Sequence, residues 1–136
     1  MQFFHLCDNT TAPNRDSPNY DKLYKIRPFM DLLIPAWQRA FYPSRELSVD
    51  ESIIAFNGRC GFIVHKPNKP HKFGLNAWVL ADSKTGYVYN WSLYSGKSNN
   101  APTRVSSDVN VGLTHQVVMN IVSPVLDFGH IVYVDN

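Results

Sequence analysis

Apolar residues in the stretch 21–41 recur at steps of three and four, which is the spacing of a helix with one buried face. They are Leu23, Ile26, Met30, Leu33 and Trp37. Two prolines, Pro28 and Pro35, fall inside this stretch, and proline removes a backbone donor from a helix. The pattern therefore predicts one kinked helix or two short helices, after a turn-rich loop at the start of the chain.

A β-strand is predicted for 47–56, which is rich in apolar and β-branched residues. It is followed by Asn57 and Gly58, a dipeptide suited to the positive φ angles of a tight hairpin turn. We therefore expect 59–65 to return as an antiparallel strand.

The next stretch, 66–72, contains two prolines and is predicted as a loop or a sheet edge, because proline cannot donate to a β-ladder. Two aromatic and β-branched runs follow at 73–82 and 86–96. The short polar segment 83–85 joins them, which predicts a second hairpin.

Apolar residues at helical spacing return after a polar loop at 96–112. They are Leu113, Val117, Val118, Ile121, Val122 and Val125. We expect Pro124 to bend this helix and Gly129 to end it. Residues 130–134 are a continuous apolar run, typical of a strand that is covered on both faces in a parallel sheet.

A helix that carries the chain back to the sheet makes the last strand run parallel to an earlier one, so the sheet is predicted to be mixed. If that neighbour is the strand 47–56, Asp50 and Asp135 come together at one end of the sheet. Open α/β sheets bind ligands in the crevice at this end. A carboxylate within a strand also requires a cation, hydrogen-bond donors or solvent, since burying it alone is costly.

The composition is that of one folded domain, with 136 residues of which 44% are hydrophobic. No apolar run reaches the ~18 residues of a membrane span and the start lacks the layout of a signal peptide, so we expect an intracellular protein without a membrane partner. Cys7 and Cys60 are expected to be buried thiols, and no cysteine or histidine spacing indicates zinc. A formal net charge of +2 is too small to identify a nucleic-acid-binding protein by itself.

Several ordered blocks of the sequence resemble the transposase domain of the piggyBac superfamily and of its transposable-element-derived relatives. These blocks are LSVDES, GRC, PNKPHKFG and VDN, while DKLYKIRPFMDLL and FHLCDN resemble the region ahead of the catalytic core. The resemblance implies an α/β fold, namely part of an RNase H-like mixed sheet preceded by a short helical segment. It divides the chain into a helical lead-in at 1–46, part of the family's dimerisation and DNA-binding region, and the N-terminal part of the core at 47–136.

The resemblance also implies catalytic residues. Asp50 matches the first catalytic acid of the family and Asp135 the second, both as ligands of Mg²⁺ or Mn²⁺. Two such ions can activate a nucleophile and stabilise the leaving oxygen during phosphoryl transfer. The family's third acid and its C-terminal zinc-binding domain have no counterpart up to Asn136, so we expect this chain alone to hold at most one weak metal site and to be inactive.

Simpler interpretations remain for these acids on pattern alone. Asp50 would be an exposed edge-strand acid or the ion-pair partner of a nearby arginine, and Asp135 the N-cap of a following helix. Glu51 is predicted on the opposite face from Asp50 as a structural or surface acid, since side chains alternate along a strand. Asp82 is predicted to be an ordinary turn residue.

Four basic residues in the segment 59–72 are candidates for DNA binding. They are Arg59, Lys66, Lys69 and Lys72. Lysine and arginine neutralise phosphates with little regard to base sequence. A solvated proline-rich loop explains the same residues equally well.

The sequence thus predicts a fragment of a piggyBac-type DNA transposase. By resemblance, the intact protein would cleave and transfer DNA strands at TTAA-flanked transposon ends in the nucleus, and would be a homodimer only when complete. The alternative is a domesticated or decayed, non-catalytic DNA-binding or interaction module. An unrelated β-rich binding protein is a third and more distant hypothesis.

Overall fold

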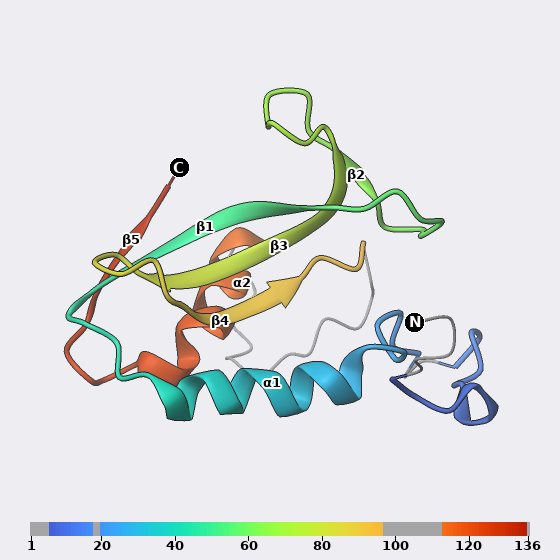
Figure 1. Cartoon of the computed structure of the whole chain (residues 1–136), viewed down its shortest axis with the longest axis horizontal. Helices are drawn as coiled ribbons and strands as arrows, with labels where there is room; N and C mark the ends of the chain where they lie inside the picture. The colour runs from blue at the N-terminus through green and yellow to red at the C-terminus, as the bar shows by residue number, and fades with distance from the viewer. Residues whose placement is uncertain (1–5, 18–19, 97–112, 136) are drawn as a thin grey trace.

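The computed structural model describes residues 6–17, 20–96 and 113–135 of the chain, which form a mixed β-sheet with helices packed on it (Figure 1). The elements in chain order are η1 (Asn9–Thr11), α1 (Arg27–Ala40), β1 (Glu46–Ala55), β2 (Val64–His65), β3 (Phe73–Asp82), β4 (Val88–Leu93), α2 (Leu113–Val122), η2 (Ser123–Val125) and β5 (Ile131–Val134). The polar loop expected at 96–112 lies, after its first residue, outside the described residues.

Strand β3 lies at the centre of the five-stranded sheet. It pairs antiparallel with β1 along one edge, and with β4 and the short β2 along the other. Strand β5 pairs parallel with β1. The predicted mixed sheet, the hairpin of β3 and β4, and the parallel placement of the last strand beside the first are therefore confirmed.

The hairpin expected at Asn57 and Gly58 is wrong. Neither residue has a positive φ angle, which a tight two-residue hairpin turn requires. The long antiparallel partner of β1 is instead β3, in the register Asp50↔Val79 and Ala55↔Gly74. Because β3 occupies that edge of β1, the segment 59–65 does not pair with β1. Only its last two residues, β2, form a strand, and they pair with the start of β3.

Helix α1 runs without a break from Arg27 to Ala40, so the alternative of two short helices is wrong. Pro28 lies in the first turn, where the missing N–H has no intrahelical partner to lose. Pro35 lies inside the helix. The C-terminal part of α1 is attached to the residue just before β4, since the Tyr87 hydroxyl donates to the carbonyl oxygen of Trp37 at 3.0 Å.

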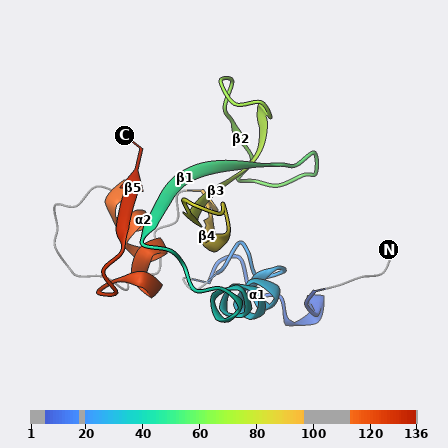
Figure 2. The same ribbon diagram turned by 60° about the vertical axis from the view of Figure 1, so that its left-hand side comes forward.

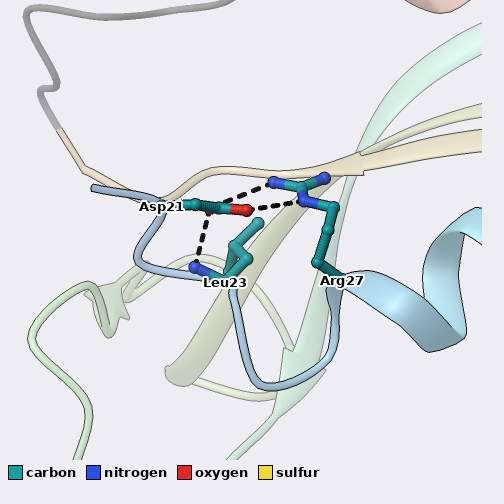
Figure 3. Close-up of polar contacts among 3 residues, drawn as sticks. All are labelled: Asp21, Leu23 and Arg27. Carbon is teal, nitrogen blue, oxygen red and sulfur yellow. Dashed lines mark hydrogen bonds and ion pairs between the residues drawn. The ribbon is translucent and has the colours of Figure 1, made fainter. Parts of the chain in front are cut away.

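The lead-in to α1 is fixed by Asp21 (Figure 3). Its carboxylate accepts from the backbone N–H of Leu23 at 2.9 Å and from Arg27 Nε at 2.7 Å. Partial burial opposes ionisation, but the hydrogen bonds from Arg27 and Leu23 outweigh it and lower the pKa of Asp21. The carboxylate therefore stays charged and ties the turn before α1 to the first residue of the helix.

Helix α2 ends at Val122, earlier than the position expected from Gly129. Pro124 has no N–H to donate to the carbonyl oxygen of Asn120, and the Ser123 hydroxyl donates to that oxygen at 2.9 Å instead. The chain then continues as the 3₁₀ turn η2. Gly129 has a φ of 79° and lies in the turn that leads into β5, not at the helix end.

The two helices pack on opposite faces of the sheet, as the turned view also indicates (Figure 2). Alternate residues of β3 belong to the two clusters, because strand side chains alternate between faces. The cluster on the α2 side contains Leu47, Val49, Leu80, Ile121, Val122 and Val125. The cluster on the α1 side contains Leu23, Met30, Ala77 and Leu93, with the half-buried Trp91 against it.

The expectation that β5 is covered on both faces is wrong. Val132 packs against the α2-side cluster, but Ile131, Tyr133 and Val134 are exposed by 39%, 53% and 45%. The reason is that β5 is a short strand at the edge of the described sheet, with β1 on one side. Its apolar character therefore does not reflect burial within the described residues.

Candidate active site

The two candidate catalytic acids lie at the same level of two adjacent parallel strands, Asp50 in the middle of β1 and Asp135 directly after β5. Val49 of β1 and Val134 of β5 are the last register partners, and Asp50 and Asp135 each follow directly. The pairing of β5 with β1 thus brings two residues together that are far apart in sequence. Both residues are exposed.

Asp50 and Glu51 point to opposite faces of the sheet, as expected. Asp50 is paired with Val79, which packs on the α1 side, and its carboxylate accepts from the Glu51 N–H at 2.6 Å. Glu51 forms an ion pair with Lys66, with Oε2 and Nζ 2.9 Å apart. Glu51 is therefore a structural acid that attaches the loop after β2 to β1.

The four basic residues proposed for DNA binding divide into two pairs. Lys66 is held by Glu51, and Lys69 Nζ donates to the backbone oxygen of Glu51 at 3.4 Å. Arg59 and Lys72 are exposed. The segment 66–72 is a loop as predicted, closed by the Lys66 N–H, which donates to the Lys72 oxygen at 2.8 Å.

A cavity of about 300 Å³ opens on the α2 side of the sheet beside this loop. It is lined by Glu51, Val64, Lys66, Asn76, Trp78, Tyr94 and Val117. Asn76 is buried, and its Oδ1 atom has no hydrogen-bond partner among the described residues. Asp50 and Asp135 do not line the cavity, so it is separate from the candidate acid pair.

The residue that sequence reasoning undervalued is Asp82. It is the last residue of β3, directly before the turn, and its side chain has no exposed surface and accepts hydrogen bonds on both oxygens. Oδ2 accepts from the Ser44 N–H at 2.6 Å, and Oδ1 from the N–H and hydroxyl of Thr85, both at 2.8 Å. The partner Ser44 is 38 residues away, and no local pattern indicates it.

These hydrogen bonds determine the charge of Asp82. The hydrogen bonds from Ser44 and Thr85 stabilise the ionised carboxylate more than its burial destabilises it. They therefore hold the pKa of Asp82 well below its usual range. Asp82 is therefore a fully ionised structural residue. Its carboxylate oxygens are already engaged in protein contacts, so the structure does not suggest it as a third metal ligand.

Both cysteines lie within the described residues. Cys7 and Cys60 are free thiols, as expected, although half-buried rather than buried. Residues 6–17, 20–96 and 113–135 contain no group of three or more His, Cys, Asp or Glu side chains that could hold a metal ion. In the same part of the chain, no helix has the length and apolar character needed to cross a bilayer.

The family described as Transposase IS4 matches residues 1–136, the whole chain. This chain belongs to that family of piggyBac-type transposases. The human PiggyBac transposable element-derived protein 5 is 30% identical over 92 residues, which are 65% of this chain and 16% of that protein.

A cryo-electron microscopy structure of a piggyBac transposase, in a synaptic complex with hairpin DNA, matches the fold. Its TM-score is 0.75 at 23% sequence identity, and the match covers 96% of this chain and 30% of that one. The fold is therefore the RNase H-like mixed sheet that the sequence predicted. The chain spans less than a third of the length of each of these two relatives.

Proposed function

We propose that Asp50 and Asp135 are the first two carboxylates of the metal-dependent site with which the intact piggyBac-type transposase cleaves and transfers DNA strands. The observation that supports this is the register of β1 and β5, in which the last partners, Val49 and Val134, are each followed by an aspartate. Neighbouring strands lie about 4.8 Å apart, so carboxylates at the same level are within reach of one divalent ion.

The chemistry of the two side chains fits Mg²⁺ or Mn²⁺, the ions proposed for this site. Both ions prefer carboxylate oxygens and retain water ligands, and Asp50 is exposed to solvent. Bound there, such an ion would supply Lewis-acid stabilisation to a phosphoryl group. The part played by this chain is to hold two anionic side chains at one level, one on β1 and one directly after β5.

The properties of the whole protein are part of the same proposal. They are action at TTAA-flanked transposon ends, homodimerisation of the complete chain, and a nuclear location. The division into a helical lead-in at 1–46 and the front of the core at 47–136 is proposed with them. The structural relative, which was solved bound to hairpin DNA, supports DNA as the partner, and the other properties follow from the sequence resemblance.

The metal site can be tested by titrating Mn²⁺ into the chain by calorimetry. We expect weak binding that falls at least tenfold in Asp50→Asn and, separately, in Asp135→Asn, because each change removes one anionic ligand of a site that has few. A double variant should lose little more than either single one, since the two side chains would bind the same ion.

Glu46→Gln is the matched control for this titration. Glu46 is an exposed acid on β1, four residues before Asp50, and its loss should change Mn²⁺ affinity less than twofold. Equal Mn²⁺ binding by the wild type and the double variant would show that the two aspartates are not ligands.

DNA binding is proposed to involve the exposed cations Arg59 and Lys72 more than the internally paired Lys66 and Lys69. Log affinity for duplex DNA falls linearly with log salt concentration, by about 0.9 per phosphate contact. In Arg59→Ala/Lys72→Ala, we expect this dependence to become shallower by about 2, because two contacts are lost. The measurement is fluorescence anisotropy with a short duplex over a salt series.

The control for charge alone is Arg39→Ala/Lys84→Ala. It removes the same two residue types from exposed positions on α1 and the β3–β4 turn. This control should leave the salt slope nearly unchanged, and an equal loss in both double variants would point to net charge instead of a binding loop.

A second candidate function is a non-catalytic, transposase-derived DNA-binding module. It is favoured by the 30% identity to a human protein that is itself described as transposable element-derived. The two candidates differ in the Mn²⁺ titration. Salt-dependent DNA binding without any Mn²⁺ affinity would support the second.

A further inference from the structure

We propose that Asp82, Ser44 and His130 form a clamp that sets the level of β5 against β1, and with it the level of Asp135 beside Asp50. This inference rests on the proposed function for its consequence at the metal site. The contacts that form the clamp do not involve either of the two aspartates.

Within the described residues, β5 has little buried side-chain surface to fix its register against β1. It has four residues, and three of them are exposed. Val132 is the β5 residue that packs into the described core. A slip of two residues along β1 would keep every side chain on its face but would move Asp135 by about 6.6 Å, because a strand rises ~3.3 Å per residue.

Three chain segments meet at Ser44. Its N–H donates to Asp82 Oδ2 at 2.6 Å, and its carbonyl oxygen lies 2.9 Å from His130 Nδ1. A carbonyl can only accept, so Nδ1 of His130 carries the proton and donates. Ser44 thus joins the end of β3 to the residue just before β5.

Backbone hydrogen bonds next to Ser44 also join the end of β3 and the start of β5 to the start of β1. The Ser83 N–H donates to the Glu46 oxygen at 3.0 Å, and the Ile131 N–H donates to the Arg45 oxygen at 2.8 Å. Glu46 and Ile131 are the first register partners of β1 and β5. The two aspartates each lie four residues beyond this pair, so fixing the pair fixes their common level.

The chemistry of its donors explains the aspartate at position 82. Its two oxygens accept from Ser44, Lys84 and Thr85, which are all donors. An asparagine would present an NH₂ group to one side, and that group cannot accept. Asp82 is therefore a positioning residue that holds the β3–β4 turn against the start of β1.

Native-state hydrogen exchange of the wild type tests the clamp without any metal. The N–H groups of Ser44, Ser83 and Ile131 should exchange with similar protection, because they open together. Exchange of Ile131 more than tenfold faster than Ser44 would mean that β5 opens separately, and this would overturn the proposal.

His130→Ala is the milder variant, since it removes one bond from a half-buried side chain. We expect exchange at the Ile131 N–H to accelerate at least tenfold while the N–H groups of the β3–β4 pair change less than twofold. Uniform acceleration in all strands would indicate a general loss of stability and would contradict the clamp.

The consequence for the acids is tested by the Mn²⁺ titration with Asp82→Asn and Leu80→Ala, under conditions in which circular dichroism shows both to be folded. If Asp82 positions the acids, Mn²⁺ affinity should fall at least tenfold in Asp82→Asn. It should fall less than twofold in Leu80→Ala, which changes only the core. Equal affinities in the two variants would overturn the link to the acids. If the wild type binds no Mn²⁺, the proposed metal site fails, and the exchange experiments still decide the clamp.

Discussion

Asp82→Asn is expected to lower the free energy of unfolding at pH 7 by about 3 kcal/mol, because hydrogen bonds to a charged acceptor contribute about 1.5–3 kcal/mol each and a buried donor is left facing an NH₂ group. The side chain keeps its size, so no cavity adds to this effect. Urea denaturation followed by circular dichroism measures it. A loss of this size is a large fraction of the 5–15 kcal/mol typical of a domain.

The effect should depend on pH in a direction set by the lowered pKa of Asp82. In the unfolded chain an aspartate titrates near 3.9, and in the folded protein it titrates lower. Its contribution is therefore complete above about pH 4 and is lost as the pH falls toward the folded pKa. The stability difference between wild type and Asp82→Asn should shrink steadily below pH 4.

Asp50→Asn provides the matched control, since Asp50 is an exposed aspartate on the same sheet. Its substitution should change the free energy of unfolding by less than about 0.5 kcal/mol, as for most surface positions. A difference between wild type and Asp82→Asn that stays constant from pH 7 to pH 3 would argue against ionised Asp82 as the source of the stability.

The second large effect is expected for Leu80→Ala, with a loss of about 2–5 kcal/mol for the removed side chain and the cavity it leaves. Leu80 is completely buried, in the cluster that joins β3 to α2. The same urea experiment measures the loss. We also expect α2 to be the element most weakened, since its buried residues Ile121 and Val122 pack in that cluster.

The control is Leu32→Ala, which makes the same chemical change on α1 at a side chain that is 74% exposed. Alanine is also the best helix former, so the substitution should be close to neutral. Equal losses at the two leucines would mean that the α2-side cluster is not the stabilising core of the sheet.

The elements that sequence patterns predicted best are those with local causes. The hairpin of β3 and β4 follows from two β-rich runs with a short polar turn, and the 66–72 loop follows from its prolines. The helix α1 follows from apolar spacing, and Pro28 is tolerated because it lies in the first turn. In each case, the element is determined by residues that are close together in the sequence.

Two predictions were wrong because a segment distant in sequence, and not the local pattern, determined the structure. Asn57 and Gly58 favour a tight turn, but the edge of β1 that such a turn would use is occupied by β3. The apolar run of β5 suggested burial on both faces, yet three of its four residues are exposed in a strand at the sheet edge. Pairing and coverage are decided by segments that a local window does not include.

The sequence by itself determined the family, through several ordered blocks, and it identified Asp50 and Asp135 as the candidate acids. Only the tertiary structure decided that these acids follow the last paired residues of two adjacent parallel strands, since register depends on hydrogen bonds between segments 85 residues apart. It also decided that Asp82 is a buried, ionised residue. Its donor Ser44 precedes β1, 38 residues before Asp82 in the chain, and only folding brings the two residues together.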